Sequence, residues 1–238
     1  MKITAHRGLS SLAPENTLAA FNKAAEMGCE WIEIDVQLNL EHIPVVIHDQ
    51  TVNRCTNGTG MVAKMSLAAL QSLDAGSWFS DEFNREYIPT LEQTLLLAKD
   101  KKLKVNIEIK GYPEDDISLL CEKIKTVITQ LNIETNQLLF SSFDLSALKV
   151  MQQLLPAIPR GLLWSKMPSN ALDLLTEINA FSAHCDYKFL TQSQAAEIKQ
   201  AGYEIYCYTP NEPEIVKEYW SWGVDMMITD TPQAYAII

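Results

Sequence analysis

The chain alternates between short apolar runs and segments with helical periodicity, and this alternation recurs along its 238 residues. In the first unit, "KITAHRG" at 2–8 is an apolar run with a polar end. Leu18 and Phe21 then recur at helical spacing before Gly28, a typical helix stop. The expected strands are 2–8, 31–37, 104–110, 137–143, 160–166, 180–186, 204–210 and 225–230, and the expected helices are 16–28, 90–101, 115–132, 144–155, 171–179, 191–201, 212–222 and 231–238. This pattern predicts a TIM (β/α)8 barrel in one domain, residues 1–238.

Two stretches interrupt the alternation. Residues 43–49, "IPVVIHD", predict a strand that forms a hairpin with 31–37, because a short polar turn joins the two. Residues 50–87 are rich in Gly, Asn, Ser and Asp and predict a small insertion after the second strand, with one short helix at 67–73. The alternative fold is an open doubly wound sheet, which usually carries a Gly-rich phosphate loop after its first strand. The sequence after 2–8 has no such loop, and this favours the barrel.

Charge and cysteine content restrict the partners and the compartment. The formal net charge of −11 argues against a nucleic-acid partner, because phosphate binding gains from clustered Lys and Arg. The start of the chain lacks the apolar segment of a secretory signal, and the sequence has no apolar run of about 18 residues or more. The 5 cysteines are scattered without a CxxC pair, which is typical of reduced thiols. We expect a cytoplasmic protein with a small-molecule substrate and no integral membrane segment.

Two of the expected strands carry acids where a buried strand is usually apolar. Glu33 and Asp35 share one face of the second strand, because side chains alternate with period two, and Glu108 and Lys110 share a face of the third. In a barrel these strand ends meet at the mouth, where barrel enzymes place their chemistry. Three carboxylates favour one hard divalent cation, Mg²⁺ or Ca²⁺, over zinc. The alternative is a buried ion network in which the acids pair with Lys110 and Arg7.

Two histidines lie at strand ends beside these acids. His6 ends the first strand and His48 ends the hairpin strand. Imidazoles titrate near neutral pH, so the pair is suited to general acid–base catalysis. Arg7 and Lys110 add positive charge that suits an anionic group such as phosphate. Together these residues predict a metal-assisted reaction at a phosphoryl centre.

Other residues at strand ends carry weaker signals. Trp164 and Tyr208 are candidate substrate contacts, although packing in the core or at the rim explains them equally well. His184 is a candidate pocket residue for which a structural role is favoured, and Asp230 is interpreted as a helix-capping acid. The remaining expectations are structural: local backbone bonds for Ser141 and Ser142, an exposed turn for His42 and a role within the insertion for Asp74.

Several short motifs occur in a characteristic order: "AHRG", "PENTLAAF", "EIDVQL", "PVVIHD", "NGTG", "LDAGSWF", "IPTLEQTL", "NIEIK", "YTPN" and "WGVDMMITDTP". Along essentially its whole length the chain resembles the glycerophosphodiester phosphodiesterases of the bacterial cytoplasmic type. The resemblance implies a metal-dependent TIM barrel that hydrolyses glycerophosphodiesters to sn-glycerol 3-phosphate and an alcohol. It also implies His6 and His48 as the general acid–base pair, Glu33, Asp35 and Glu108 as metal ligands, Arg7 and Lys110 as phosphate contacts, and Glu15 as a supporting residue.

Alternative functions stay open at this point. The same barrel and metal would serve a lysophospholipase D-type phosphodiesterase, although the net charge of −11 argues mildly against attraction to membranes. A catalytically silent binding module would have no reason to keep both histidines and all three acids. An aldose isomerase-like barrel would need more carboxylates from later strands. The sequence also leaves open whether water or the substrate's 2-hydroxyl attacks, and whether the protein is a homodimer; the resemblance favours His6 as the base and His48 as the acid.

Overall fold

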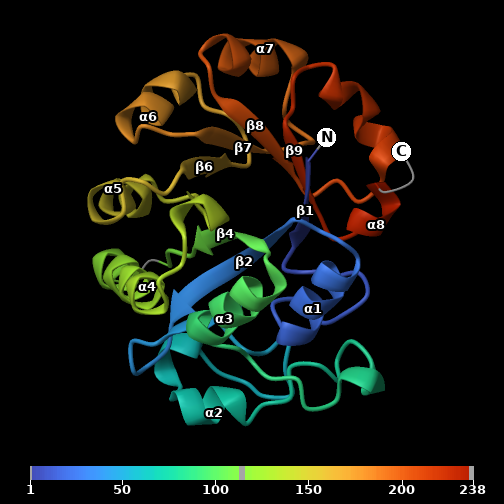
Figure 1. Ribbon diagram of the computed structural model, residues 1–238, viewed down its shortest axis with the longest axis vertical. Helices are drawn as coiled ribbons and strands as arrows, with labels where there is room; N and C mark the ends of the chain where they lie inside the picture. The colour runs from blue at the N-terminus through green and yellow to red at the C-terminus, as the bar shows by residue number, and fades with distance from the viewer. Residues whose placement is uncertain (1, 113–115, 236–238) are drawn as a thin grey trace.

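The computed structural model describes residues 2–112 and 116–235, and its sheet has nine strands. One of them, β3, is antiparallel, and the others are parallel and close into a barrel surrounded by helices (Figure 1). Strand β1 closes the barrel because it pairs with both β2 and β9. The barrel strands are β1 Lys2–His6, β2 Trp31–Leu38, β4 Lys104–Ile109, β5 Leu138–Ser142, β6 Arg160–Trp164, β7 Ser182–Asp186, β8 Glu204–Tyr208 and β9 Met226–Thr229. The predicted TIM barrel is confirmed, whereas its extent as one domain over 1–238 stays a prediction.

Several of the helices between the strands begin at side-chain caps. Thr90 and Thr191 each form a capping box, in which the threonine hydroxyl accepts the amide of a glutamine three residues on and the glutamine oxygen accepts the threonine amide. These bonds satisfy amides that a helix leaves unpaired at its start. The outer helices are α1 Leu18–Glu26, α3 Leu91–Lys101, α4 Ile117–Leu131, α5 Leu145–Leu154, α6 Ala171–Glu177, α7 Gln192–Gln200 and α8 Pro232–Tyr235.

One expected α-helix has a different geometry. The segment 212–222 forms a 3₁₀ helix, η4 Pro213–Trp220, in which Val216 is the buried residue. Tyr219 and Trp220 of this segment also pack against the main core, so it buries an apolar face although its geometry is not α-helical. Residue 115 and residues 236–238, which the expected helices include, lie outside the described residues. Among the described helices, none combines the length and the apolar character needed to cross a membrane.

The two faces of β2 explain why the acids point into the barrel. Ile32, Ile34 and Val36 have no exposed surface and pack in the main core between the sheet and the helices. Glu33 and Asp35 alternate with them and therefore face the barrel interior. The apolar half of the strand thus holds it in place while the polar half lines the inside of the barrel.

The predicted hairpin and insertion are both present. Strand β3, Pro44–Val46, pairs antiparallel with the end of β2, with Val36 opposite Val46. The insertion that follows contains η1 Val62–Lys64, α2 Leu67–Gln71 and η2 Asp81–Phe83, and it lies at one side of the barrel beyond α1 and α3 (Figure 1). Its own apolar cluster attaches it to β3; the buried members are Val45, Ile47, Val52, Val62, Leu70, Ala75 and Ile88.

Candidate active site

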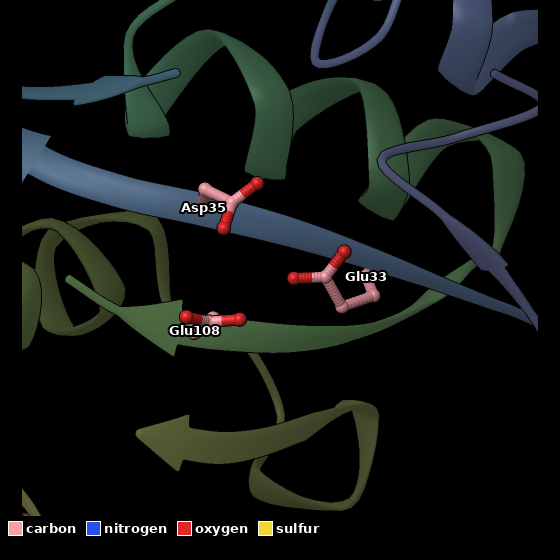
Figure 2. A group of neighbouring side chains, drawn as sticks. All are labelled: Glu33, Asp35 and Glu108. Atoms are coloured by element: carbon pink, nitrogen blue, oxygen red, sulfur yellow. The ribbon is translucent and has the colours of Figure 1, made fainter. Parts of the chain in front are cut away.

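Three carboxylates converge at the ends of two adjacent strands. Asp35 on β2 is in register with Glu108 on β4, and Glu33 lies one inward-facing position earlier on β2. One oxygen of each carboxylate lies within 4.8 Å of an oxygen of each of the others. Figure 2 shows the three groups facing one another across the space between the two strands. All three side chains are buried, so the sequence-predicted cluster forms as expected from the strand alternation.

Burial and mutual repulsion make this cluster electrostatically costly. Burial raises the pKa of Glu33 well above its usual value, and the neighbouring Asp35 and Glu108 raise it further. Burial likewise raises the pKa of Glu108, with a second contribution from Asp35. Burial also opposes ionisation of Asp35, but Arg7 and Lys110 outweigh it and lower the pKa of Asp35 to about 2.

Two cations partly neutralise the cluster. Arg7 Nε lies 3.1 Å from Asp35 Oδ2, and Lys110 Nζ lies 3.4 Å from Asp35 Oδ1 and 2.7 Å from Glu108 Oε1. The ion network weighed from the sequence therefore exists. Glu33 is only partly satisfied in it: Glu33 Oε2 accepts the Arg7 backbone amide over 3.1 Å and lies 3.8 Å from His6 Nε2. Glu33 Oε1 is buried with no hydrogen-bond partner among the described residues.

The unpaired oxygen of Glu33 shows that the donor set fits a divalent cation. A buried anionic oxygen without a partner is costly, and a cation bound by all three acids would satisfy it. The set consists of hard oxygen donors, which Mg²⁺ and Ca²⁺ prefer. Glu33, Asp35 and Glu108 therefore form a candidate metal centre, with the ion network as its surroundings rather than as an alternative to it.

The turn after β1 positions Arg7 and a residue that the sequence analysis did not select. Arg7 and Asn16 have φ angles of 56° and 57°, and Gly8 has a φ of 81°. A Cβ at Gly8 would lie 2.7 Å from the backbone of Ala20 in α1, so the turn approaches the helix too closely for a larger residue. Asn16 Nδ2 donates to Asp35 Oδ2 over 2.9 Å and holds this carboxylate in place. Its signal was present in "PENT", where only Glu15 was considered.

Each of the two histidines is backed by a carboxylate. His6 Nδ1 lies 2.7 Å from Asp230 Oδ1, and His48 Nδ1 lies 2.7 Å from Asp49 Oδ1. The bond to Asp49 could have been anticipated, because the two residues are adjacent in the "HD" motif. An ionised carboxylate only accepts hydrogen bonds, so in both rings Nδ1 carries the proton and Nε2 is the nitrogen left for chemistry.

The helix-cap interpretation of Asp230 is wrong. Its carboxylate accepts hydrogen bonds from His6, from Ser10 Oγ at 3.0 Å and from Asn211 Nδ2 at 2.8 Å. Burial opposes its ionisation, but the bond to His6 and the charge of that ring lower the pKa of Asp230 to about 2. Asp230 follows β9, and closure of the barrel brings it next to the end of β1. Nothing local in "TDTP" indicates this partner.

Both histidines and two of the acids, Glu33 and Glu108, line a pocket of about 150 Å³. Tyr208 lines it, and the centroids of the Tyr208 and Phe143 rings lie 6.1 Å apart in an edge-to-face arrangement.

Trp164, selected from the sequence as a candidate substrate contact, is not among the residues that line this pocket. Leu163 faces the pocket and Trp164, one position later, faces the helices and packs against the main core, because neighbouring strand residues point to opposite sides. The full lining is His6, Arg7, Glu33, His48, Asn106, Glu108, Lys110, Ser141, Phe143, Leu163, Tyr208, Thr209 and Ile228.

The remaining selected residues lie around this pocket or beneath it. Glu15 Oε1 accepts a hydrogen bond from Arg7 Nη1 at 2.8 Å, which fits its expected supporting role. Ser142 Oγ donates to the Ile109 carbonyl, as expected for a local backbone contact. His184 is fully buried against Ser182 and is not among the pocket residues. The expected local backbone bond is wrong for Ser141, whose Oγ is buried in the pocket lining without a hydrogen-bond partner among the described residues. As expected, Asp74 accepts bonds from Gly76 and Ser77 in the insertion, and His42 is exposed.

The closed barrel and this polar mouth define a TIM barrel with a candidate active site at its mouth. Residues 6–234 match the model of the glycerophosphoryl diester phosphodiesterase family. A glycerophosphodiester phosphodiesterase of Caldanaerobacter subterraneus subspecies tengcongensis is 36% identical over 235 residues, covering 97% of this chain and 94% of the relative. One of Bacillus subtilis is 31% identical over 246 residues, covering 97% of this chain and 84% of the relative.

Solved structures agree with these relatives. An Oleispira antarctica phosphodiesterase in complex with the product sn-glycerol-3-phosphate superposes with a TM-score of 0.94 at 34% identity, covering 99% of this chain and 96% of the other. A glycerophosphodiester phosphodiesterase of Agrobacterium tumefaciens superposes with a TM-score of 0.83 at 28% identity, covering 100% of both chains. The chain therefore belongs to the glycerophosphoryl diester phosphodiesterase family, whose enzymes hydrolyse glycerophosphodiesters.

Proposed function

We propose that this enzyme hydrolyses glycerophosphodiesters to sn-glycerol 3-phosphate and an alcohol with the help of one divalent cation, Mg²⁺ or Ca²⁺. The similar Oleispira antarctica phosphodiesterase, solved with that product, supports the choice of product. The observation that carries the metal dependence is the buried Glu33 Oε1 atom, which lacks a hydrogen-bond partner among the described residues while two further carboxylates face it.

Glu33, Asp35 and Glu108 would hold the cation. When bound, it would supply positive charge that neutralises the phosphate oxygens as charge builds up in the transition state. The three acids must be ionised to bind it, although burial and repulsion raise the pKa of Glu33 and Glu108 in its absence. The fold thus holds the three acids close together at a cost in electrostatic free energy, and a bound cation would lower that cost.

Arg7 and Lys110 would bind the phosphate group from the same side as the acids. Both line the pocket. Burial disfavours the charge on each of them, but the neighbouring carboxylates outweigh it and raise the pKa of both groups above its usual value. The two side chains therefore remain cationic at every physiological pH. Glu15 fixes the Arg7 guanidinium through Nη1 and so supports the orientation of this contact.

His6 and His48 would move the protons of the reaction. His6 Nε2 takes the proton of the attacking oxygen as the new bond to phosphorus forms. Attack by water gives sn-glycerol 3-phosphate directly, whereas attack by the glycerol 2-hydroxyl gives a cyclic phosphate that a water molecule must then open. His48, protonated on both nitrogens, gives its Nε2 proton to the alcohol oxygen as the bond between that oxygen and phosphorus breaks. Asp230 and Asp49 hold the opposite nitrogen of each ring and so keep Nε2 available.

Two polar groups on the pocket floor are suited to the glycerol moiety. Asn106 Oδ1 and Ser141 Oγ are buried and have no hydrogen-bond partner among the described residues. Both line the pocket beside Tyr208. Glycerol hydroxyls bound there would satisfy them, whereas an apolar group would leave them unpaired. This supports a glycerol end over an acyl chain at the base of the pocket.

The direct test is release of sn-glycerol 3-phosphate from glycerophosphocholine by the purified protein. We expect EDTA to abolish the release and added Mg²⁺ or Ca²⁺ to restore it. Release that is indifferent to EDTA would show that the acids form an ion network alone. Absence of release from any glycerophosphodiester with either metal present would overturn the proposed substrate class. The cytoplasmic location and the oligomeric state stay predictions.

A further inference from the structure

Arg54, in the insertion, joins two acids from separate segments of the chain, Asp49 and Glu15. Its guanidinium donates to Asp49 through Nε at 2.8 Å and Nη2 at 2.9 Å. It also donates to Glu15 through Nη1 at 2.7 Å and Nη2 at 2.9 Å. One planar group thus makes four short bonds to two carboxylates. This geometry uses the fixed fork of arginine, which a lysine ammonium does not have.

Each of these two acids holds a different residue of the proposed machinery. Asp49 Oδ1 accepts from His48 Nδ1 at 2.7 Å. Glu15 Oε1 accepts from Arg7 Nη1 at 2.8 Å. A continuous chain of contacts therefore runs from His48 through Asp49, Arg54 and Glu15 to Arg7. Its ends belong to segments that meet only in the folded protein, the hairpin strand and the turn after β1.

We propose that Arg54 is a positioning residue that fixes His48 and Arg7 relative to each other through Asp49 and Glu15. This inference rests on the proposed roles of His48 as acid and Arg7 as phosphate ligand. It also assigns a purpose to the insertion, which supplies Arg54 from outside the barrel. The contrasting view is a surface ion pair that only attaches the insertion. Isolated surface pairs contribute little, but Arg54 bonds each of two carboxylates twice, and each carboxylate holds a pocket residue.

Steady-state kinetics distinguish the two views. Because proton transfer and phosphate binding both depend on exact placement, we expect Arg54→Ala to lower kcat about 10- to 100-fold and to raise KM several-fold. Arg54→Lys should recover only part of either effect, since a single ammonium cannot bridge both carboxylates. Lys64→Gln is the matched control: Lys64 is an exposed cation of the same insertion without an ion pair among the described residues, and its loss should leave kcat and KM unchanged.

Chemical rescue and non-additivity test whether Arg54 acts through its partners. Millimolar guanidinium should restore part of the kcat of Arg54→Ala and none of the kcat of His48→Ala. The double variant Arg54→Ala with Asp49→Asn should lose little more activity than the more impaired single variant, because both changes release the same ring. Additive losses, or a kcat of Arg54→Ala within twofold of wild type, would overturn the proposal.

A spectroscopic measurement separates this proposal from the proposed function. The His48 Nδ1 proton, held by Asp49, should appear as a slowly exchanging downfield signal in the NMR spectrum of the wild type and be lost or broadened in Arg54→Ala. An unchanged signal in Arg54→Ala would overturn the positioning role even if the enzyme is active. A wild type without turnover would overturn the proposed function, while loss of the signal in Arg54→Ala would still support the role of Arg54.

Discussion

His6 Nδ1 and Asp230 Oδ1 lie 2.7 Å apart although 224 positions of sequence separate the two residues. The contact follows from the pairing of β1 with β9, which places the ends of the first and last barrel strands side by side. Ser10 and Asn211 bond the same carboxylate and restrict its orientation. The proposed catalytic base His6 is therefore held by a residue that directly follows the last strand of the barrel.

The first prediction concerns this carboxylate. Asp230→Asn should lower kcat on the order of 10²-fold, because an amide can donate to Nδ1 and so stabilise the wrong tautomer of His6. Asp225→Asn is the matched control at the other end of β9: Asp225 bonds Lys199 and the Ile205 amide, far from the pocket lining. It should lower the melting temperature and leave kcat unchanged. Equal kcat values for the two variants would argue against a role of Asp230 in catalysis.

The second prediction concerns the other histidine. His48→Ala should retain the fold and metal binding but lower kcat by about 10²- to 10⁴-fold, as expected for loss of a general acid. His42→Asn is the control, because His42 is exposed in a turn with a φ of 56° that asparagine tolerates. The measurement is turnover of glycerophosphocholine at saturating substrate. Activity of His48→Ala within a few-fold of wild type would remove His48 from the mechanism.

The third prediction links metal binding to protons. Burial and two neighbouring acids raise the pKa of Glu33, which favours its protonated form when the metal is absent. Because only the carboxylate binds a cation, adding Mg²⁺ should release up to about one proton per ion, and the affinity should rise as the pH rises. Titration calorimetry in buffers of different ionisation enthalpy measures the released protons. Glu33→Gln should lower the number of protons released per bound ion, because only the smaller contribution of Glu108 is left. Binding without proton release in the wild type would contradict the pKa argument.

The fourth prediction concerns a histidine outside the reaction. Burial lowers the pKa of His184 from 6.5 to about 3, so between these pH values the unfolded chain binds a proton that the folded protein excludes. Stability therefore falls as the pH falls through this window, with a contribution of about 1.4 kcal/mol per pH unit from this group. His184→Asn should be less stable at pH 7 because it leaves a cavity, but its stability should depend less steeply on pH. Urea unfolding at several pH values gives the free energy of unfolding of each variant, with His42→Asn as the control. Parallel plots of this free energy against pH for wild type and His184→Asn would contradict the prediction.

Much of the fold and the centre of the site could be predicted from local pattern. Helical spacing and strand alternation are properties of neighbouring residues, so they indicated the order of elements and the barrel. The same period of two placed Glu33 and Asp35 on the inner face of β2. Because parallel strands of a barrel end at one rim, the convergence of these acids with Glu108 followed from topology alone.

The tertiary structure decided which groups hold those residues in place. Asp230 has the local sequence of a helix cap, and only closure of the barrel brings it to His6. Trp164 stands at a strand end like Tyr208, but the register of β6 turns it toward the helices. Arg54 lies in an irregular insertion whose path no periodicity describes, yet it bonds Asp49 and Glu15. A sequence pattern indicates which face of its own strand or helix a residue occupies. The hydrogen-bond partner of that residue depends on how distant elements pack against each other. This packing is determined only when the whole barrel closes.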